Sequence, residues 1–237
     1  MTVLAVHTSY SLLVATGGDQ VEQAQRLRHR VFAGELGAVL RTPRPGLDVD
    51  EFDASCDHLV IREDATGEVV GTYRMLPPGR LPHLYADGEF NLRGIGPLRD
   101  ALVETGRSCV HPDHRTGAVV NLMWAGIARY MHLAGYRWLA GCASVGPADA
   151  AGVWELARRR HLAPPAWRVT PRNPYPVDRS PAPAKVVVPP LLRGYLRLGA
   201  WVGGPPAYDP DFGCADFFVL LSLDLVDPRY LRHFLGG

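Results

Sequence analysis

Residues 104–111 hold the most informative chemistry in this chain of 237 residues, because two opposite charges precede a short apolar run. Glu104 can serve as a general base, directly or through a water molecule, for an attacking group that must first lose a proton. Arg107 follows on the same stretch and can equally form a structural ion pair with Glu104. The residue types leave both alternatives open. The stretch reads Glu-Thr-Gly-Arg-Ser-Cys-Val-His.

The elements around this stretch are predicted from the spacing of apolar residues. A strand over residues 103–110 runs into a loop at Pro112, and helical periodicity predicts a helix over residues 117–133 that ends at Gly135. Asp19 is expected to cap an earlier helix. Further strands are predicted at residues 10–16, 58–62, 69–75, 138–143 and 217–224, and further helices at 20–36, near 95–102, at 148–159 and at 190–200.

The order of these elements predicts an α/β fold with a central mixed, mostly antiparallel sheet flanked by helices. We expect a single domain over residues 1–237. The proline-rich residues 163–183 are expected to form loop or irregular edge. The chain has no GxGxxG, P-loop or GxSxG motif, so the pattern favours an acyltransferase layout over a dinucleotide-binding fold.

The net charge of +1 argues against a general nucleic-acid binder, but the charge is unevenly distributed. Residues 151–200 contain nine Lys or Arg against Glu155 and Asp178, which gives +7. This stretch predicts either a solvated arginine-rich face or a basic surface that attracts an acidic partner. Its candidate residues are Arg158, Arg159, Arg160, Arg168, Arg193 and Arg197.

The four cysteines are widely spaced and form no CxxC or CxxH motif, which favours free thiols in a reducing compartment. Cys109 is better interpreted as a small buried hydrophobe than as a nucleophile. His111, Asp113 and His114 do not have a spacing that predicts a metal site, and we expect none. The chain has no signal-peptide pattern and no run of 18 or more apolar residues. We therefore expect a cytoplasmic protein that touches the inner face of a membrane at most from the side.

Several motifs, in this order and spacing, resemble the ornithine-lipid N-acyltransferase family, often labelled hemolysin-like. That family lies within the N-acetyltransferase (GNAT) superfamily and is related to the acyl-homoserine-lactone synthases. The resemblance covers nearly the whole chain. Its motifs are Arg28 to Phe32, Asp50 to Asp53, Cys56 to Leu59, Gly71 to Arg74, Glu104 to Pro112, Trp124 to Ala128, Gly141 to Ser144, Pro189 to Ala200 and Ala215 to Phe217.

The resemblance implies transfer of a fatty acyl group, typically 3-hydroxyacyl, from acyl carrier protein to the α-amine of an amino acid, most often ornithine. It implies no permanently bound cofactor, since the acyl-carrier thioester is a substrate, with acyl-coenzyme A as the alternative donor. The implied catalytic residues are Glu104 and Arg107. The implied substrate-binding residues are Arg28, Phe32, Asp50, Asp53, Arg74 and Ser144, and the implied donor-binding residues are Ser108, Cys109, Val110, Arg115 and Gly117.

Asp50 and Asp53 have two possible roles. Either carboxylate can hold a cationic substrate such as ornithine, with Arg74 binding the substrate carboxylate. Alternatively, these residues form a salt-bridge network that pins the N-terminal helix to the sheet, with Arg74 locking Asp53 in place. The sequence does not distinguish the two.

The loop over residues 111–120 bears on the acyl donor. Coenzyme-A acetyltransferases place small residues here so that backbone amides at a helix N-terminus hold a pyrophosphate. If this motif is counted from Arg115, Val120 occupies a position that requires a small residue. If it is counted from His114, Val119 does. The motif is therefore degraded in either register. A relaxed loop fits a carrier-protein donor, which presents a single phosphate.

Three rival functions remain open at the level of sequence. They are an acyl-coenzyme-A-dependent transferase acting on another small amine, an acyl-homoserine-lactone-type synthase, and a non-catalytic module that binds a carrier protein or a membrane. Retention of both Glu104 and Arg107 speaks against the last of these.

Overall fold

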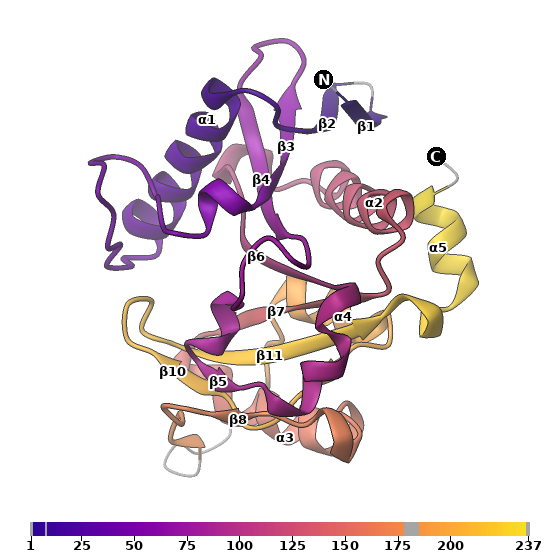
Figure 1. Ribbon diagram of the computed structural model, residues 1–237. Coiled ribbons are helices and arrows are strands. Elements are labelled where there is room, and N and C mark those ends of the chain that lie inside the picture. Colours follow the sequence, from indigo (N-terminus) through magenta and orange to yellow (C-terminus); the bar gives the residue numbers. More distant parts are fainter. Residues whose placement is uncertain (1, 8, 178–184, 236–237) are drawn as a thin grey trace. The chain divides into compact units, whose positions relative to one another are not determined.

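The computed structural model describes residues 2–7, 9–177 and 185–235, which fold into two compact units (Figure 1). Unit 1 comprises Met1–Arg80, Thr105–Tyr136 and Pro228–Gly237. Unit 2 comprises Leu81–Glu104 and Arg137–Asp227. The expectation of a single domain over residues 1–237 remains a prediction.

Unit 1 is built on a sheet in the order β1-β2-β3-β4-β6. The first four strands pair antiparallel through consecutive neighbours, so each returns beside the one before it. Strand β1 was not predicted from the sequence. The strands are β1 (Thr2–His7), β2 (Tyr10–Val14), β3 (Asp57–Glu63), β4 (Val69–Leu76) and β6 (Leu102–Val110), of which the residues from Thr105 onward belong to this unit.

Helices α1 (Gly18–His29) and α2 (Gly117–Ala134) pack on opposite faces of this sheet. Successive strand residues point to opposite faces. Leu13 packs against Ala24 of α1, whereas Leu12 meets Gly126 of α2. The period-two alternation of β2 therefore supplies apolar contacts to both helices. Helix α5 (Pro228–Leu235), which was not predicted, also belongs to unit 1 and contacts α2.

The first predicted helix, over residues 20–36, is only partly correct. The α-helix ends at His29 and continues as a π-helix, η1 (Arg30–Glu35), so the apolar period changes within the segment. Gly17 rather than Asp19 occupies the N-cap. Asp19 lies in the first turn, where the helix dipole still favours a negative charge.

Unit 2 contains the N-terminal end of β6, which pairs parallel with β7 from Leu102↔Trp138 to Glu104↔Ala140. Strand β11 pairs antiparallel with β7 along its whole length, and β10 and β9 pair antiparallel with β11. The strands predicted over residues 138–143 and 217–224 are therefore confirmed. Their bounds are β7 (Trp138–Val145), β9 (Trp201–Val202), β10 (Ala207–Asp209) and β11 (Cys214–Ser222).

A small second sheet agrees with the prediction that residues 163–183 form loop or irregular edge. β5 (Phe90–Asn91) pairs with β8 (Thr170–Pro171), whose proline fits the edge of a short ribbon. Residues 178–184 of that prediction lie outside the described residues. The remaining elements of unit 2 are α3 (Pro147–Arg160), α4 (Pro190–Arg197), and the 3-10 helices η3 (Tyr85–Asp87), η4 (Arg93–Ala101), η6 (Pro165–Trp167) and η8 (Leu223–Leu225).

The 3-10 helix η4 leads directly into β6 and is closely packed at Gly94 within unit 2. A Cβ atom on Gly94 would lie 2.7 Å from the backbone oxygen of Ala166 and 3.0 Å from that of Arg168. We expect Gly94→Ala to lower the free energy of unfolding by about 1–3 kcal/mol, because backbone atoms must move. Gly96→Ala is the matched control, since nothing lies within 4 Å of its added Cβ. Equal denaturant midpoints for the two variants would contradict this account.

Candidate active site

Glu104 lies on β6 within unit 2, and backbone donors hold its buried carboxylate. The amide of Tyr85 donates to Oε2 at 2.6 Å, and the amide of Ala86 donates to Oε1 at 2.8 Å. These bonds stabilise a negative charge at a fixed position. They also hold η3 against β6. Glu104 therefore has a structural role in addition to any catalytic role.

Arg107 lies on the part of β6 that belongs to unit 1, and its backbone has the unusual φ of +54°. A non-glycine residue in the left-handed region costs on the order of 1–2 kcal/mol. Its guanidinium faces two aspartates, with Nε 3.3 Å from Asp48 and Nη2 3.4 Å from Asp50. Glu104 and Arg107 therefore have separate partners. Arg107 faces aspartates, whereas Glu104 accepts hydrogen bonds from backbone amides.

Arg28 of α1 is the centre of a buried charge network in unit 1 and is 0% exposed. Its Nε donates to Asp48 at 2.8 Å, and its Nη2 donates to Asp53 at 2.7 Å and to the backbone oxygen of Asp48 at 2.5 Å. A charge buried this deeply is tolerable only when it is paired and hydrogen-bonded. Asp48 was not singled out from the sequence, because nothing in its spacing separates it from the neighbouring acids.

Arg74 of β4 extends the network. It donates to Asp50 at 2.6 Å and lies 3.5 Å from Asp53. Burial tends to raise the pKa of Asp50, but the charge and hydrogen bond of Arg74, together with the charge of Arg107, outweigh it and the pKa is lowered. His58 lies beside Asp53, and burial lowers the pKa of this imidazole. The network thus pairs aspartates with arginines beside a histidine whose lowered pKa favours its neutral form.

The network brings together most of the residues predicted to bind substrate: Arg28, Asp50, Asp53 and Arg74. Phe32 is buried on η1 and Ser144 lies on β7 in unit 2, so neither is in the network. The arginines already compensate both aspartates. The structural alternative, in which a salt-bridge network pins α1 to the sheet, therefore has all the contacts that it requires. These contacts join α1, β4 and β6 to the loop that precedes β3. Contact with substrate remains a prediction for these residues.

The residues predicted to bind the acyl donor lie at the end of β6 and the start of α2. Burial raises the pKa of Cys109 to about 12, which fits a protonated, inert thiol and not a nucleophile. Gly117 is the first residue of α2. Arg115 is already engaged by Glu35 at 2.6 and 2.5 Å, and its Nε donates to the backbone oxygen of Val110. A donor phosphate would have to compete with Glu35 for this guanidinium.

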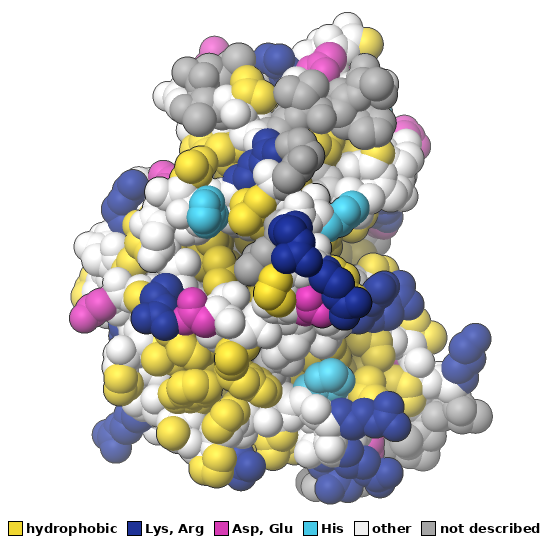
Figure 2. Space-filling model, turned by 90° about the vertical axis from the view of Figure 1, so that its right-hand side faces the viewer, with side chains coloured by type: hydrophobic (Ala, Val, Ile, Leu, Met, Phe, Trp, Pro, Cys, Tyr) yellow, Lys and Arg dark blue, Asp and Glu magenta, His cyan; other side chains and the backbone are white. Residues whose placement is uncertain are grey.

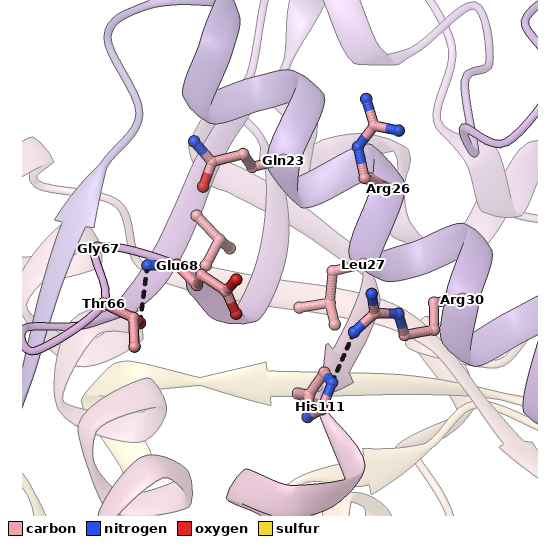
Figure 3. Close-up of a pocket in the computed structure, with 9 residues that line it drawn as sticks. Gln23, Arg26, Leu27, Arg30, Thr66, Gly67, Glu68 and His111 are labelled. Atoms are coloured by element: carbon pink, nitrogen blue, oxygen red, sulfur yellow. Dashed lines mark hydrogen bonds between the residues drawn. The ribbon is translucent and has the colours of Figure 1, made fainter.

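A pocket of about 340 Å³ lies in unit 1 between α1 and the turn that joins β3 to β4 (Figure 3). Arg30 points toward His111 at the end of β6, and Nη1 of Arg30 is 2.7 Å from Nε2 of His111. The Thr66–Gly67 turn forms the opposite wall. Its lining combines apolar Leu27 and Val69 with polar side chains, among them Gln23, Arg26, Arg30, Glu68 and His111.

A buried acidic cluster in unit 2 escaped the sequence analysis. Single oxygen or sulfur atoms of Glu89, Cys142 and Asp216 lie within 4.8 Å of one another. Burial, followed by the negative charge of Asp216, raises the pKa of Glu89 to about 9, and burial also raises the pKa of Asp216. Glu89 precedes the two-residue strand β5 and is far from Asp216 in sequence, so no spacing rule would have joined them.

A second set of potential metal ligands shares Asp216. It contains Asp209 and Cys214, whose ligand atoms also lie within 4.8 Å of that of Asp216. Asp209 already accepts the backbone amides of Asp211 and Phe212. Burial raises the pKa of both Cys142 and Cys214, which opposes formation of the thiolates that metals prefer. The expectation of no metal site remains a prediction.

Fold and sequence together define the class of this protein. Residues 27–125 match the acetyltransferase (GNAT) domain family. A coenzyme-A-dependent acyl-homoserine lactone synthase, BjaI, superimposes with a TM-score of 0.55 at 18% identity, over 92% of this chain and 82% of that one. The protein thus has the GNAT fold, and the predicted α/β fold with a mostly antiparallel sheet is confirmed.

Full-length relatives define the family. The L-ornithine N(alpha)-acyltransferase of Rhodobacter capsulatus is 33% identical over 97% of this chain and 96% of its own length. That of Brucella abortus is 32% identical over 95% and 89%, respectively. The chain belongs to the L-ornithine N(alpha)-acyltransferase family. Among the described residues, no helix is both long and apolar enough to cross a membrane.

The buried network predicts a large cost for neutralising one of its acids. Asp53→Asn removes the carboxylate that faces Arg28, and we expect the free energy of unfolding to fall by about 3–5 kcal/mol. Glu22→Gln is the control, because Glu22 pairs with Arg26 and Arg44 at an exposed site and should leave stability close to wild type. Urea unfolding of the three proteins measures both. A small loss for Asp53→Asn would show that Asp48 alone compensates Arg28.

The acidic cluster predicts a dependence of stability on pH. The pKa of Glu89 is raised from 4.5 to about 9, so between these values the folded protein holds a proton that the unfolded chain has lost. The free energy of unfolding should therefore fall as pH rises through this window, by at most about 1.4 kcal/mol per pH unit. Glu89→Gln should flatten the profile measured by urea unfolding. Parallel profiles for the variant and wild type would contradict the assignment.

Proposed function

We propose that this protein transfers a fatty acyl group from the thioester of an acyl carrier protein to the α-amine of ornithine. The observation that carries the proposal is the similarity to L-ornithine N(alpha)-acyltransferases over nearly the whole chain. In the reaction, the neutral amine attacks the thioester carbonyl and forms the amide bond. The carbon–sulfur bond breaks, and the pantetheine sulfur leaves with a proton.

Glu104 is our candidate for the base that takes the proton from the amine. Two backbone amides hold its carboxylate at a fixed position, which limits the rearrangement needed before the proton is taken. Arg107, in contrast, faces Asp48 and Asp50. We assign Arg107 to holding the loop before β3 against β6, as a positioning residue.

The donor is proposed to be a carrier-protein thioester. The N-cap residue of α2, Thr116, makes no side-chain capping bond, so the first amides of α2 remain suited to an anion such as the phosphate of the pantetheine arm. We assign the backbone of Ser108, Cys109 and Val110 to pairing with that arm. The coenzyme-A-dependent relative of similar fold keeps acyl-coenzyme A as the second candidate donor.

Carrier docking is proposed for exposed arginines of unit 2. Arg193 and Arg197 are exposed one turn apart on α4, and Arg160 is exposed at the end of α3. By comparison, Arg158 and Arg159 already pair with Glu155. Figure 2 shows basic side chains in several separate groups over one face of the molecule, some of them beside acidic side chains. Acyl carrier proteins are acidic, so the exposed arginines of α3 and α4 favour their encounter.

Contact with the membrane follows from the chemistry of the product, which is an amphiphile. The same exposed arginines of α4 would meet anionic headgroups, while Leu192, Tyr195 and Leu196 are buried in unit 2. A peripheral contact at the inner face of the membrane is therefore part of the proposal, together with a cytoplasmic location.

The test is acyl transfer by purified protein from a 3-hydroxyacyl carrier protein to ornithine, with the product identified by mass. We expect N-acylornithine, and we expect Glu104→Gln to lower kcat by roughly 10²–10⁴-fold. The glutamine retains one acceptor for the two backbone amides, so a melting curve must accompany the rates. Loss of the acidic limb of the pH–rate profile would separate a base from a merely structural residue.

The control variant is Glu51→Gln, which alters an exposed acid in the loop before β3. It should leave kcat unchanged. Full turnover by Glu104→Gln would eliminate Glu104 as the base. Turnover with acyl-coenzyme A but not with the carrier thioester would replace the proposed donor, and acylation of no amine at all would overturn the function.

A further inference from the structure

Two carboxylates in unit 2 lack any positively charged partner among the described residues. Asp216 is 3% exposed, and both carboxylate oxygens of Glu89 are shielded from solvent without a hydrogen-bond partner. The thiol of Cys142 lies beside them, with all three groups within 4.8 Å of one another. Buried acids normally carry a partner, because burial of an unpaired charge is costly.

Buried acids in unit 1 are treated differently. Arg28 bonds to Asp48 and Asp53, and Arg74 bonds to Asp50. The chain has 24 arginines, yet none of the described ones pairs with Glu89 or Asp216. The pair therefore needs either a shared proton or a cation that is not part of the chain.

The cluster is close to the surface of unit 2. Asp216 stands opposite Ser144 in the pairing of β11 with β7, and a hydrogen bond from the Ser144 side chain lowers the pKa of Asp216. Ser144 is exposed, and Glu89 and Cys142 are partly exposed residues. Ser144, which the family resemblance implies as a substrate-binding residue, is the exposed residue beside Asp216.

Glu104 lies within electrostatic reach of the same cluster. Burial and the charges of Glu89 and Asp216 raise the pKa of Cys142, and the charge of Glu104 adds to this effect. Glu104 pairs with Ala140 on β7, the strand that carries Cys142 and Ser144. Unit 2 therefore holds acidic groups at two neighbouring places. An amino acid with two amines is the acceptor that such an arrangement fits.

We propose that Glu89 and Asp216 bind the side-chain ammonium of the acceptor and so select a diamino acid over amino acids with neutral side chains. This inference rests on the proposed function, because Glu104 then faces the α-amine that is acylated. The ammonium displaces the proton that the pair holds in its absence, so that each carboxylate then accepts a charge-assisted hydrogen bond, and Ser144 supplies a further polar contact. Asp50 and Asp53 of unit 1, which were candidates for this role in the sequence analysis, remain paired with arginines.

A metal ion is the competing occupant, and the burial of the thiols disfavours a zinc site that uses them. Zinc sites that use cysteine require the thiolate. Burial raises the pKa of both Cys142 and Cys214, so each thiol holds its proton. What remains are hard carboxylate oxygens, which also suit an ammonium group.

The test compares acylation of ornithine with that of norvaline, which has the same carbon skeleton without the side-chain amine. We expect wild type to prefer ornithine by at least about 100-fold in kcat/KM, since an unpaired buried polar site rejects the analogue that lacks its partner. Glu89→Gln and Asp216→Asn should each raise KM for ornithine about 10-fold or more, with turnover of norvaline unchanged. The preference for ornithine should fall accordingly.

The matched control is Asp224→Asn, which removes an exposed acid of unit 2 that pairs with Arg137. It should keep the wild-type preference. Calorimetric binding of ornithine and norvaline to wild-type protein provides a measurement that needs no variant to fold and no turnover. Ornithine should bind and norvaline should bind at least about 10-fold more weakly.

Three outcomes would overturn the inference. The first is an unchanged preference for ornithine in both variants, which leaves the proposed function standing. The second is equal binding of ornithine and norvaline to wild type. The third is loss of ornithine turnover on treatment with EDTA and its recovery with Zn²⁺, which would identify the occupant as a metal. Absence of acyl transfer to any amine, with selective ornithine binding retained, would instead refute the function and support the site.

Discussion

The complete burial of the Arg28 guanidinium is the constraint on which unit 1 depends. A charge removed from water must be compensated where it lies, and Asp48 and Asp53 provide this from the loop and the 3-10 helix η2 (Asp53–Ser55) that precede β3. Their positions in turn define where Arg74 and Arg107 find carboxylates. One buried cation on α1 thereby holds an irregular loop and two strands in register, a task that an apolar contact would leave less specific.

The two units treat buried acids in opposite ways. In unit 1 each aspartate of the network faces an arginine, so the charges are satisfied before any substrate arrives. In unit 2 the carboxylates of Glu89 and Asp216 share a buried site with a thiol. Under our proposal, the side-chain ammonium of the acceptor binds acids that no arginine has already compensated. Glu89 and Asp216 are such acids, whereas the aspartates of unit 1 are not.

Strand β6 contributes to both arrangements. Its residue Glu104 anchors η3 in unit 2, while Arg107, at a left-handed backbone position, reaches the aspartates of unit 1. A single strand therefore carries both the candidate base and a member of the network that folds the N-terminal part of the chain. This explains why the two charged residues lie close together on one strand although they have separate partners.

The sequence alone determined the α/β class, the principal strands and helices, and the family motifs, because local periodicity and turn residues act over short distances. It also singled out Glu104, whose role as the base remains a prediction, and the arginines Arg28, Arg74 and Arg107 that the structure places against aspartates. It did not separate a substrate-binding role for Asp50 and Asp53 from a structural one, and it missed Asp48 and the pairing of Glu89 with Asp216. Only tertiary structure decides which charges are compensated, because the partners of a buried carboxylate come from segments distant in the chain.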